Sequence, residues 1–401
     1  MKKNINTQLS YYFVILSFFG IFFLFQKHNT GNDSTISEWL INYSGGFTKR
    51  GIIGQISVLV SPIFDFNLRD SILFFQILIF ITYFISLYFF LKDILINNLL
   101  LLAIFTPIFI LYPIAEIEVL ARKELFIFCF YIFYLNISNK NLRIIYKIIC
   151  LPIAVLIWEP VIFFFPFWLA TDMIKNNYLK FKDIIFKSLP SFLPSILIAL
   201  YIAINPITPE AHLQMENFLK INFNENCYMS CGLLLSKSTI YEQFEHNFNK
   251  YSLEIFIRYF LIILIGFGPL FILSFYSKLK NTKLFFFKNF KNILWPLLLI
   301  LQPVLILFAM GYDWGRWVNI SYVFSFLFFL DLYKKKFLIL DLSRCSIEKI
   351  FQKNRKTFLF IFILFCFGWN PKTVITGDVA SFPGYRIPYK AFKIINLNYI
   401  K

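Results

Sequence analysis

The sequence predicts an all-α, polytopic integral membrane protein, and two observations carry that prediction. First, 58% of the residues are hydrophobic and 21% are aromatic, whereas apolar residues make up about 45 to 50% of an ordinary soluble domain. Second, apolar runs recur from one end of the chain to the other, so no separate soluble domain of ordinary size can be cut out. We therefore treat residues 1–401 as a single transmembrane domain.

Eleven apolar runs are candidates for transmembrane helices. They are residues 11–26, 72–91, 95–113, 124–137, 144–158, 160–171, 188–205, 255–276, 292–311, 317–333 and 357–369. A straight span needs about 20 residues, and several runs are shorter, so we expect about eleven spans. Prolines interrupt the stretch 144–171, which we interpret as a helical hairpin with Trp158, Glu159 and Pro160 at its tip.

The charged loops predict the orientation of the chain. Lys2 and Lys3 precede the first apolar run, and no small-residue cleavage site follows it, so we expect a retained first helix. With a cytoplasmic N-terminus, the inner segments carry the whole formal net charge of +17, in agreement with the positive-inside rule. The tail, residues 370–401, is then external to the cell (inner) membrane. Since the bases do not cluster on one water-exposed domain, we expect the lipid bilayer and no nucleic acid as a partner.

The same assignment places most acids and all three histidines on the outer face. The outer segments include the loop 27–71 and a loop of about 50 residues, 206–254. We also expect interfacial helices beside the transmembrane helices. The histidines show no metal-ligand spacing, and no glycine-rich phosphate loop is present. We therefore expect no metal or other cofactor.

The first outer loop has the composition of a functional site. Residues 31–54 combine acids, bases, aromatic residues and glycines directly after the first apolar run. Asp33 and Glu38 are candidate proton acceptors, and the adjacent cations Lys49 and Arg50 are of the kind that bind phosphate. The alternative is an amphipathic helix on the bilayer surface, with its apolar side chains toward lipid.

A second group of charges lies in the segment AEIEVLARKELF. Glu118 and Arg122 are four residues apart, which predicts that they pair on one helical face, with Lys123 beside them. The alternative is an ordinary charged helix end at the membrane surface.

Two shorter outer segments also carry candidates. Partial burial at the hairpin tip would raise the pKa of Glu159, and a nearby cation would lower it again; the alternative is a solvated tip residue. In GYDWGRW, Asp313 and Arg316 are three residues apart, and Arg316 suits bidentate binding of phosphate. The tryptophans beside Arg316 fit an aromatic belt at the membrane surface.

Cys227 and Cys231, in ENCYMSCG, are candidates for a disulfide that braces the long outer loop. This prediction requires an oxidising outer compartment. The alternative is a pair of free thiols.

This arrangement resembles the GT-C class of membrane glycosyltransferases and the functionally related O-antigen polymerases. The resemblance covers the first outer loop, GNDSTISEW followed by NYSGGFTKRG, and the overall layout. In the GT-C class, an acidic residue in the first external loop acts beside surface helices on a lipid-linked sugar donor. The resemblance implies that role for Asp33 or Glu38, which stand five residues apart rather than adjacent as in many such enzymes.

Sugar transfer from a polyprenyl phosphate or diphosphate to a glycan acceptor needs two kinds of group. A carboxylate takes the acceptor's proton, and cations stabilise the departing phosphate. We expect Asp33, Glu38 or Glu159 as the base. The expected substrate-binding residues are Lys49, Arg50, Glu118, Arg122, Lys123, Asp313 and Arg316. The alternatives are a transporter or flippase of lipid-linked oligosaccharide, which would need charges facing a cavity in mid-membrane, and a non-catalytic membrane protein.

Overall fold

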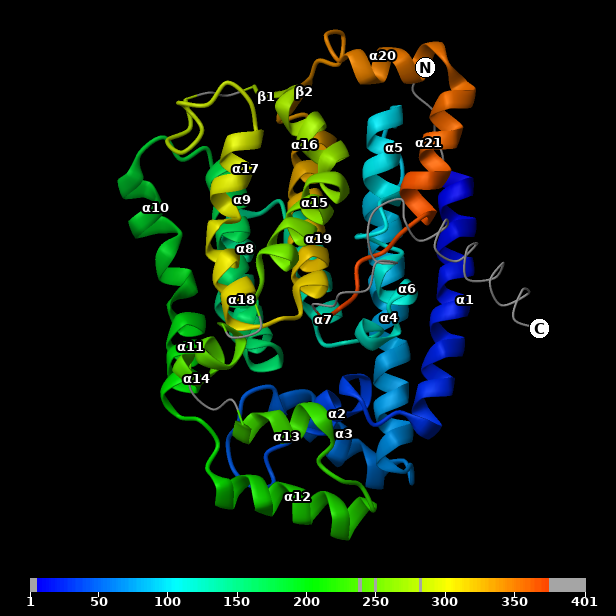
Figure 1. Ribbon diagram of the computed structural model, residues 1–401. Helices are drawn as coiled ribbons and strands as arrows, with labels where there is room; N and C mark the ends of the chain where they lie inside the picture. Colours follow the sequence, from blue (N-terminus) through cyan, green and yellow to red (C-terminus); the bar gives the residue numbers. More distant parts are fainter. Residues whose placement is uncertain (1–5, 237–239, 249–250, 281–282, 375–401) are drawn as a thin grey trace, which may run out of the picture. The chain divides into compact units, whose positions relative to one another are not determined.

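The computed structural model describes residues 6–236, 240–248, 251–280 and 283–374, and these are mostly helical (Figure 1). The prediction of an all-α protein is confirmed in this coarse form. By their internal contacts, the described residues divide into two compact units. Unit 1 holds residue 6, residues 93–116 and the described residues from 251 onward, and unit 2 holds residues 7–92 and 117–248.

Unit 2 consists of α-helices and short 3-10 helices (η). Its elements are α1 (Asn6–Thr30), α2 (Ser34–Leu40), α3 (Gly51–Ile63), α4 (Leu68–Leu91), η1 (Ile117–Val119), α7 (Glu124–Asn136), α8 (Lys140–Ile157), η2 (Glu159–Phe164), α9 (Phe165–Lys175), α10 (Phe181–Lys187), η3 (Leu189–Phe192), α11 (Leu193–Ile204), α12 (Pro209–Phe223), α13 (Met229–Ser236) and α14 (Ile240–Phe248). Within this unit α4 packs against α7, α7 against α8, and α8 against α11.

The two long helices α1 and α4 lie side by side (Figure 1). Gly20 allows this close approach, because a side chain there would enter the space of the Phe80 ring. The Phe13 ring meets the Phe84 ring edge-on, with centroids 5.3 Å apart. Aromatic packing of this kind contributes about 0.5 to 1.5 kcal/mol beyond the buried area, so this pair stabilises the contact between α1 and α4.

The short helix α2 depends on its neighbours for stability. Asp33 caps it, because its side chain accepts a hydrogen bond from the Thr35 backbone N–H at 2.9 Å. Seven residues are too few for an independent helix, and Gln76 of α4 fixes α2 by donating to the Thr35 carbonyl at 2.7 Å. Gly54 of α3 lies directly under the carbonyls of Trp39 and Ile41, where no side chain fits. These contacts hold α2 in one position.

The helix α3 matches the amphipathic alternative only in part. Ile53 and Val58 are buried, whereas Ile56 and Leu59 are exposed. The apolar residues of this helix therefore divide between the interior of the protein and its surface.

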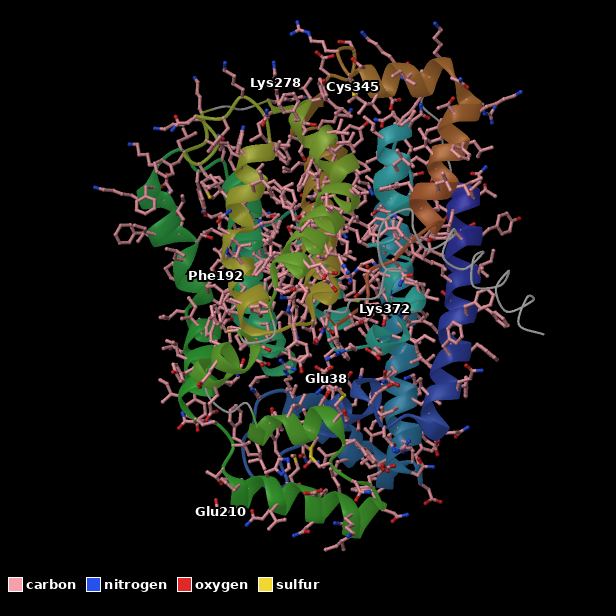
Figure 2. All side chains as sticks on the ribbon, in the orientation of Figure 1. Glu38, Phe192, Glu210, Lys278, Cys345 and Lys372 are labelled. Carbon is pink, nitrogen blue, oxygen red and sulfur yellow. A yellow bond between two sulfur atoms is a disulfide. The ribbon has the colours of Figure 1, made fainter. Side chains whose placement is uncertain are left out.

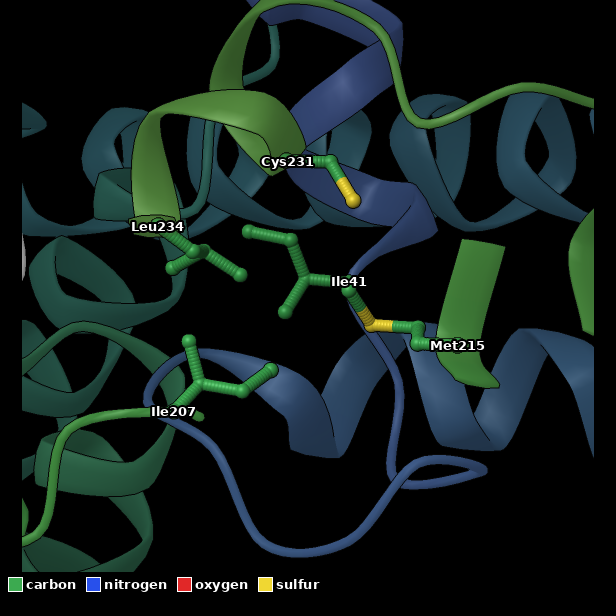
Figure 3. Close-up of a cluster of buried hydrophobic side chains, with 5 residues drawn as sticks. All are labelled: Ile41, Ile207, Met215, Cys231 and Leu234. Carbon is green, nitrogen blue, oxygen red and sulfur yellow. The ribbon is translucent and has the colours of Figure 1, made fainter. Parts of the chain in front are cut away.

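The described residues of the predicted outer loop, 206–236 and 240–248, are largely helical, and this segment contacts α2. Thr208 caps α12 by accepting from the Ala211 N–H, and α13 packs on α2. The Ser230 N–H of α13 donates to the Ser37 hydroxyl of α2 at 2.8 Å. A small hydrophobic cluster completes the contact (Figure 3); it comprises Ile41, Ile207, Met215, Cys231 and Leu234.

Unit 1 is organised around the helix α19. Its elements are α5 (Asn98–Phe105), α6 (Tyr112–Ala115), α15 (Leu253–Gly266), α16 (Gly268–Phe275), β1 (Ser277–Leu279), α17 (Leu294–Ile300), η4 (Gln302–Val304), α18 (Leu305–Met310), α19 (Trp314–Lys334), β2 (Leu338–Leu340), α20 (Ser346–Lys353) and α21 (Arg355–Phe367). α19 is buried from Trp314 to Leu332. The two strands pair antiparallel, with Lys278 opposite Ile339, and α5 packs against both α16 and α21.

The predicted number of eleven spans is not confirmed. Each predicted apolar run contains helix, but many runs are short or broken by 3-10 turns. By length and composition, three helical stretches of the described chain qualify as spans: residues 6–29, 68–91 and 181–204. The pair α15 and α16, bent by 56°, makes a fourth if it counts as one span. Prolines explain several of the breaks, because proline removes a helical hydrogen bond and clashes with the preceding turn.

Candidate functional site

Five of the predicted site residues meet in unit 2. Glu38 comes from α2, Arg50 from the residue before α3, Arg122 and Lys123 from the turn before α7, and Glu159 from the start of η2. Figure 2 labels Glu38 beside α2. We call these five residues the charge cluster. Arg50 and Glu159 are 109 positions apart in the sequence, so the fold rather than local sequence brings the cluster together.

The buried member of the cluster, Glu38, lies between two arginines. Its Oε2 accepts a hydrogen bond from Arg122 Nε at 2.9 Å, and its Oε1 lies 3.5 Å from Arg50 Nη1. The Glu38 side chain is fully buried and that of Arg122 is 6% exposed. A buried carboxylate of this kind is retained only with cationic partners, so Glu38 helps to fix both guanidinium groups.

Arg50 joins the two carboxylates of the cluster. Its Nε and Nη2 donate to the two Glu159 oxygens at 2.7 and 2.8 Å, which is the bidentate fork typical of arginine and carboxylate. Arg50 has a left-handed backbone with φ of 64°, unusual for a non-glycine residue. Its carbonyl accepts from Lys123 Nζ at 2.6 Å, which stabilises this conformation.

The pKa values of Lys123 and Glu159 are shifted by this environment. Burial lowers the pKa of Lys123 to about 7, even though the negative charge of Glu38 acts to raise it. Burial alone would raise the pKa of Glu159, but the charge and hydrogen bonds of Arg50 outweigh it and hold the pKa below its usual value. Lys49, half-buried beside Arg50, lowers the pKa of Glu159 further. The cluster therefore has cations in excess over acids, as an anion-binding site requires.

Asp33 lies outside the charge cluster. Besides capping α2, its carboxylate forms an ion pair with Lys27 at the end of α1. Burial would raise its pKa, but the hydrogen bonds from Lys27 and Thr35 lower it below its usual value. In this position Asp33 acts as a structural link between α1 and α2.

The predicted pairing of Glu118 with Arg122 is wrong. Residues 117–119 form the 3-10 turn η1, and Ala121 is left-handed with φ of 48°, so no continuous helix presents both side chains on one face. Glu118 is exposed, and Glu38 from α2 is the partner of Arg122. Local spacing failed here because the segment turns instead of continuing as a helix.

Asp313 and Arg316 belong to unit 1, where they form an ion pair with each other. Arg316 Nη1 lies 3.3 Å from Asp313 Oδ2, and its guanidinium lies over the Trp317 ring at 5.1 Å. Arg316 is 3% exposed, and Trp314 and Trp317 are buried. These residues pack in the interior of unit 1, whereas an aromatic belt would lie at its surface.

The predicted disulfide between Cys227 and Cys231 is present, with Cα atoms 5.1 Å apart. His212 Nε2 lies 3.3 Å from Cys227 Sγ, a neighbour that sequence spacing did not reveal. These three side chains have the donor atoms of a metal site. Both sulfur atoms are bonded to each other in the disulfide, however, so neither is a thiolate ligand.

Arg69, at the start of α4, attaches the disulfide segment to the first helix. It donates to Glu225 at 2.5 and 3.2 Å and to the His28 and Gly31 carbonyls at 3.1 Å each. Its guanidinium also lies over the Tyr228 ring. A single arginine therefore connects the end of α1, the start of α4 and the segment before α13.

A second buried charged group, in α8 and α9, was not anticipated from the sequence. Asp172 accepts from Tyr134 at 2.6 Å, from Ser188 at 2.8 Å and from Arg143 at 3.3 Å, and it pairs with Lys147. The available signal was that Arg143 and Lys147 precede or enter an apolar run. Their hydrogen-bond donors are engaged within unit 2, which is the pattern of a structural network.

No family model, curated protein or solved structure matches this chain. The resemblance to the GT-C class therefore stays a hypothesis based on the first outer loop and the layout.

Proposed function

We propose that the chain is a membrane glycosyltransferase or glycan polymerase that uses a polyprenyl-linked sugar donor. In this proposal it works on the outer face of the cytoplasmic membrane in surface polysaccharide synthesis. The observation that supports it is the charge cluster, in which two carboxylates and three bases from four segments meet in unit 2.

The cluster contains the groups that this reaction needs. A carboxylate in contact distance of the acceptor hydroxyl takes up its proton. Guanidinium groups stabilise the negative charge that develops on the phosphate as the bond to the sugar breaks. The three bases of the cluster outnumber its two acids, and Lys49 adds a further cation beside Glu159.

The position of the cluster along α8 fits a site at a membrane surface. Glu159 lies two residues after the last residue of α8, whereas Lys147 lies about two turns after its first residue. From Lys147 to Ile157 the helix rises about 15 Å, and the residues between Lys147 and Glu159 are apolar. We propose that this interval lies within the bilayer, with the cluster on the outer side, a cytoplasmic N-terminus and additional spans built from the shorter helices.

The alternative from another class is a transporter or flippase of lipid-linked oligosaccharide. The buried Asp172, with Arg143 and Lys147, is the observation that bears on it, since charges within a membrane often mark a transport path. Arg143, Lys147 and Ser188 all donate hydrogen bonds to Asp172. This pairing favours a structural role for the group.

The test is transfer of sugar from a lipid-linked donor in membranes that contain Asp33→Asn, Glu38→Gln or Glu159→Gln. A general base contributes about 10² to 10⁴-fold to the rate, so at least one variant should lose transfer by that factor while protein level holds. If all three variants transfer sugar at the wild-type rate, the glycosyltransferase proposal gives way to the transporter.

A further inference from the structure

The charge cluster has one comparatively accessible side. The side chains of Arg50 and Glu159 are 20% and 21% exposed, whereas those of Glu38 and Arg122 are 0% and 6% exposed. Lys123 is fully buried. A ligand that approaches from solvent or lipid therefore meets the pair of Arg50 and Glu159 first.

In the structure as it stands, Glu159 is a poor proton acceptor. Both of its oxygens accept hydrogen bonds from the same guanidinium, at 2.7 and 2.8 Å. This pairing favours the ionised form and holds the pKa below its usual value. Glu159 becomes basic only when Arg50 moves away from it.

A phosphate competes with Glu159 for Arg50. The guanidinium fork fits phosphate oxygens as well as carboxylate oxygens, and Lys49 adds a second cation on the same side. The exchange leaves Glu38 paired, since Arg122 Nε still donates to it at 2.9 Å. The backbone of Arg50 stays in place because Lys123 holds its carbonyl at 2.6 Å, so only the side chain has to turn.

From this geometry we infer that the phosphate of a lipid-linked donor displaces Glu159 from Arg50, and that the released Glu159 is the base of the transfer. The inference rests on the proposed function. It distinguishes Glu159 from Glu38, whose role is to position Arg50 and Arg122.

The chemical step balances within these groups. The acceptor oxygen forms a bond to the anomeric carbon of the sugar while the bond from that carbon to the phosphate oxygen breaks. The electron pair of the broken bond stays on the lipid phosphate, where Arg50 stabilises it. The proton of the acceptor hydroxyl passes to the Glu159 carboxylate.

The test measures binding and transfer separately in the full-length protein in lipid nanodiscs, with farnesyl diphosphate as the binding probe. Glu159→Gln removes the competitor for Arg50 and should bind the probe about 1.4- to five-fold more tightly than the wild type, since an accessible ion pair contributes about 0.2 to 1 kcal/mol. The same variant should transfer sugar about 10² to 10⁴-fold more slowly. Glu210→Gln, an exposed acid of α12, is the matched control and should change neither value.

Unchanged or weaker binding by Glu159→Gln would overturn the inference that phosphate displaces Glu159 from Arg50. If the wild type transfers sugar in the same assay, the proposed function still stands. Tighter binding by the variant without any transfer by the wild type would instead overturn the proposed function. Equal affinity for inorganic pyrophosphate and farnesyl diphosphate would overturn the lipid-linked source of the phosphate. Glu159→Asp, which keeps the charge, checks folding and should bind the probe as the wild type does.

Discussion

The backbone conformation of Arg50 links the two halves of the charge cluster. A left-handed non-glycine residue costs about 1 kcal/mol or more, and here its carbonyl receives the Lys123 ammonium. The same conformation lets its side chain reach Glu159 and Glu38. A single residue under backbone strain therefore sets the spacing of both carboxylates.

The pKa of Lys123 predicts a pH dependence of anion binding. Its pKa of about 7 means that it is largely neutral above that value. Diphosphate affinity should fall by about three- to tenfold between about pH 7 and about pH 9, where the ligand itself is already ionised. Lys123→Met should bind weakly with no such pH dependence, as measured by titration with farnesyl diphosphate. A wild-type affinity that is constant over this range would refute the prediction.

Glu38 should be required for stability as well as for the site. Removing one partner of a buried ion pair leaves the other charge uncompensated and costs about 3 to 5 kcal/mol. Glu38→Gln is therefore expected to lower the free energy of unfolding by about that amount, measured by denaturation in detergent. Glu210→Gln, on the surface of α12, should change it by less than about 0.5 kcal/mol. Equal stability of the two variants would mean that the pairing of Glu38 contributes little.

At the scale of elements, α2 is positioned by its contacts rather than by its own helical propensity. It receives Gln76 from α4, Gly54 from α3 and Ser230 from α13. Because α2 carries Glu38, we expect loss of these contacts to displace its carboxylate.

Gly54→Ala tests the contact between α2 and α3. The added Cβ would meet the Trp39 carbonyl oxygen at 2.6 Å and the Ile41 carbonyl still more closely. Overpacking of this kind costs about 1 to 3 kcal/mol, so thermal unfolding should shift to lower temperature. Gly232→Ala in α13 is the control, because its nearest contact would be 3.8 Å away. If both variants unfold at the wild-type temperature, α2 tolerates displacement from α3.

The sequence predicted the helices and most members of the cluster, because apolar runs and concentrated charges are local features. The partners could not be predicted, because Arg50 and Glu159 are brought together by helix packing across 109 positions. The one local pairing that failed, Glu118 with Arg122, assumed a continuous helix where Ala121 turns the chain. The buried group around Asp172 was missed because its charges adjoin apolar runs and look like ordinary helix ends.

At the scale of the whole molecule, a different charged group of unit 2 lies toward each end of α8. Arg143 and Lys147 belong to the start of the helix, and Glu159 follows its end. If the start faces the cytoplasm, as the positive-inside rule indicates, a reporter that is active only in the cytoplasm should be active when fused after Asn177. It should be inactive when fused after Phe223 in α12. The opposite pattern would invert the proposed topology.

The bridge between Cys227 and Cys231 makes the same question answerable by chemistry, without any fusion. A disulfide persists only in an oxidising compartment, whereas the free thiols of Cys129, Cys345 and Cys366 are buried and that of Cys150 is half-buried within the apolar run of α8. In intact cells a membrane-impermeant maleimide should label the chain only after mild reduction, and Cys227→Ser with Cys231→Ser should abolish that labelling. The presence or absence of this disulfide in a folded molecule thus indicates on which side of the membrane the loop lies. A chain inserted the wrong way round would be distinguishable by its thiols alone.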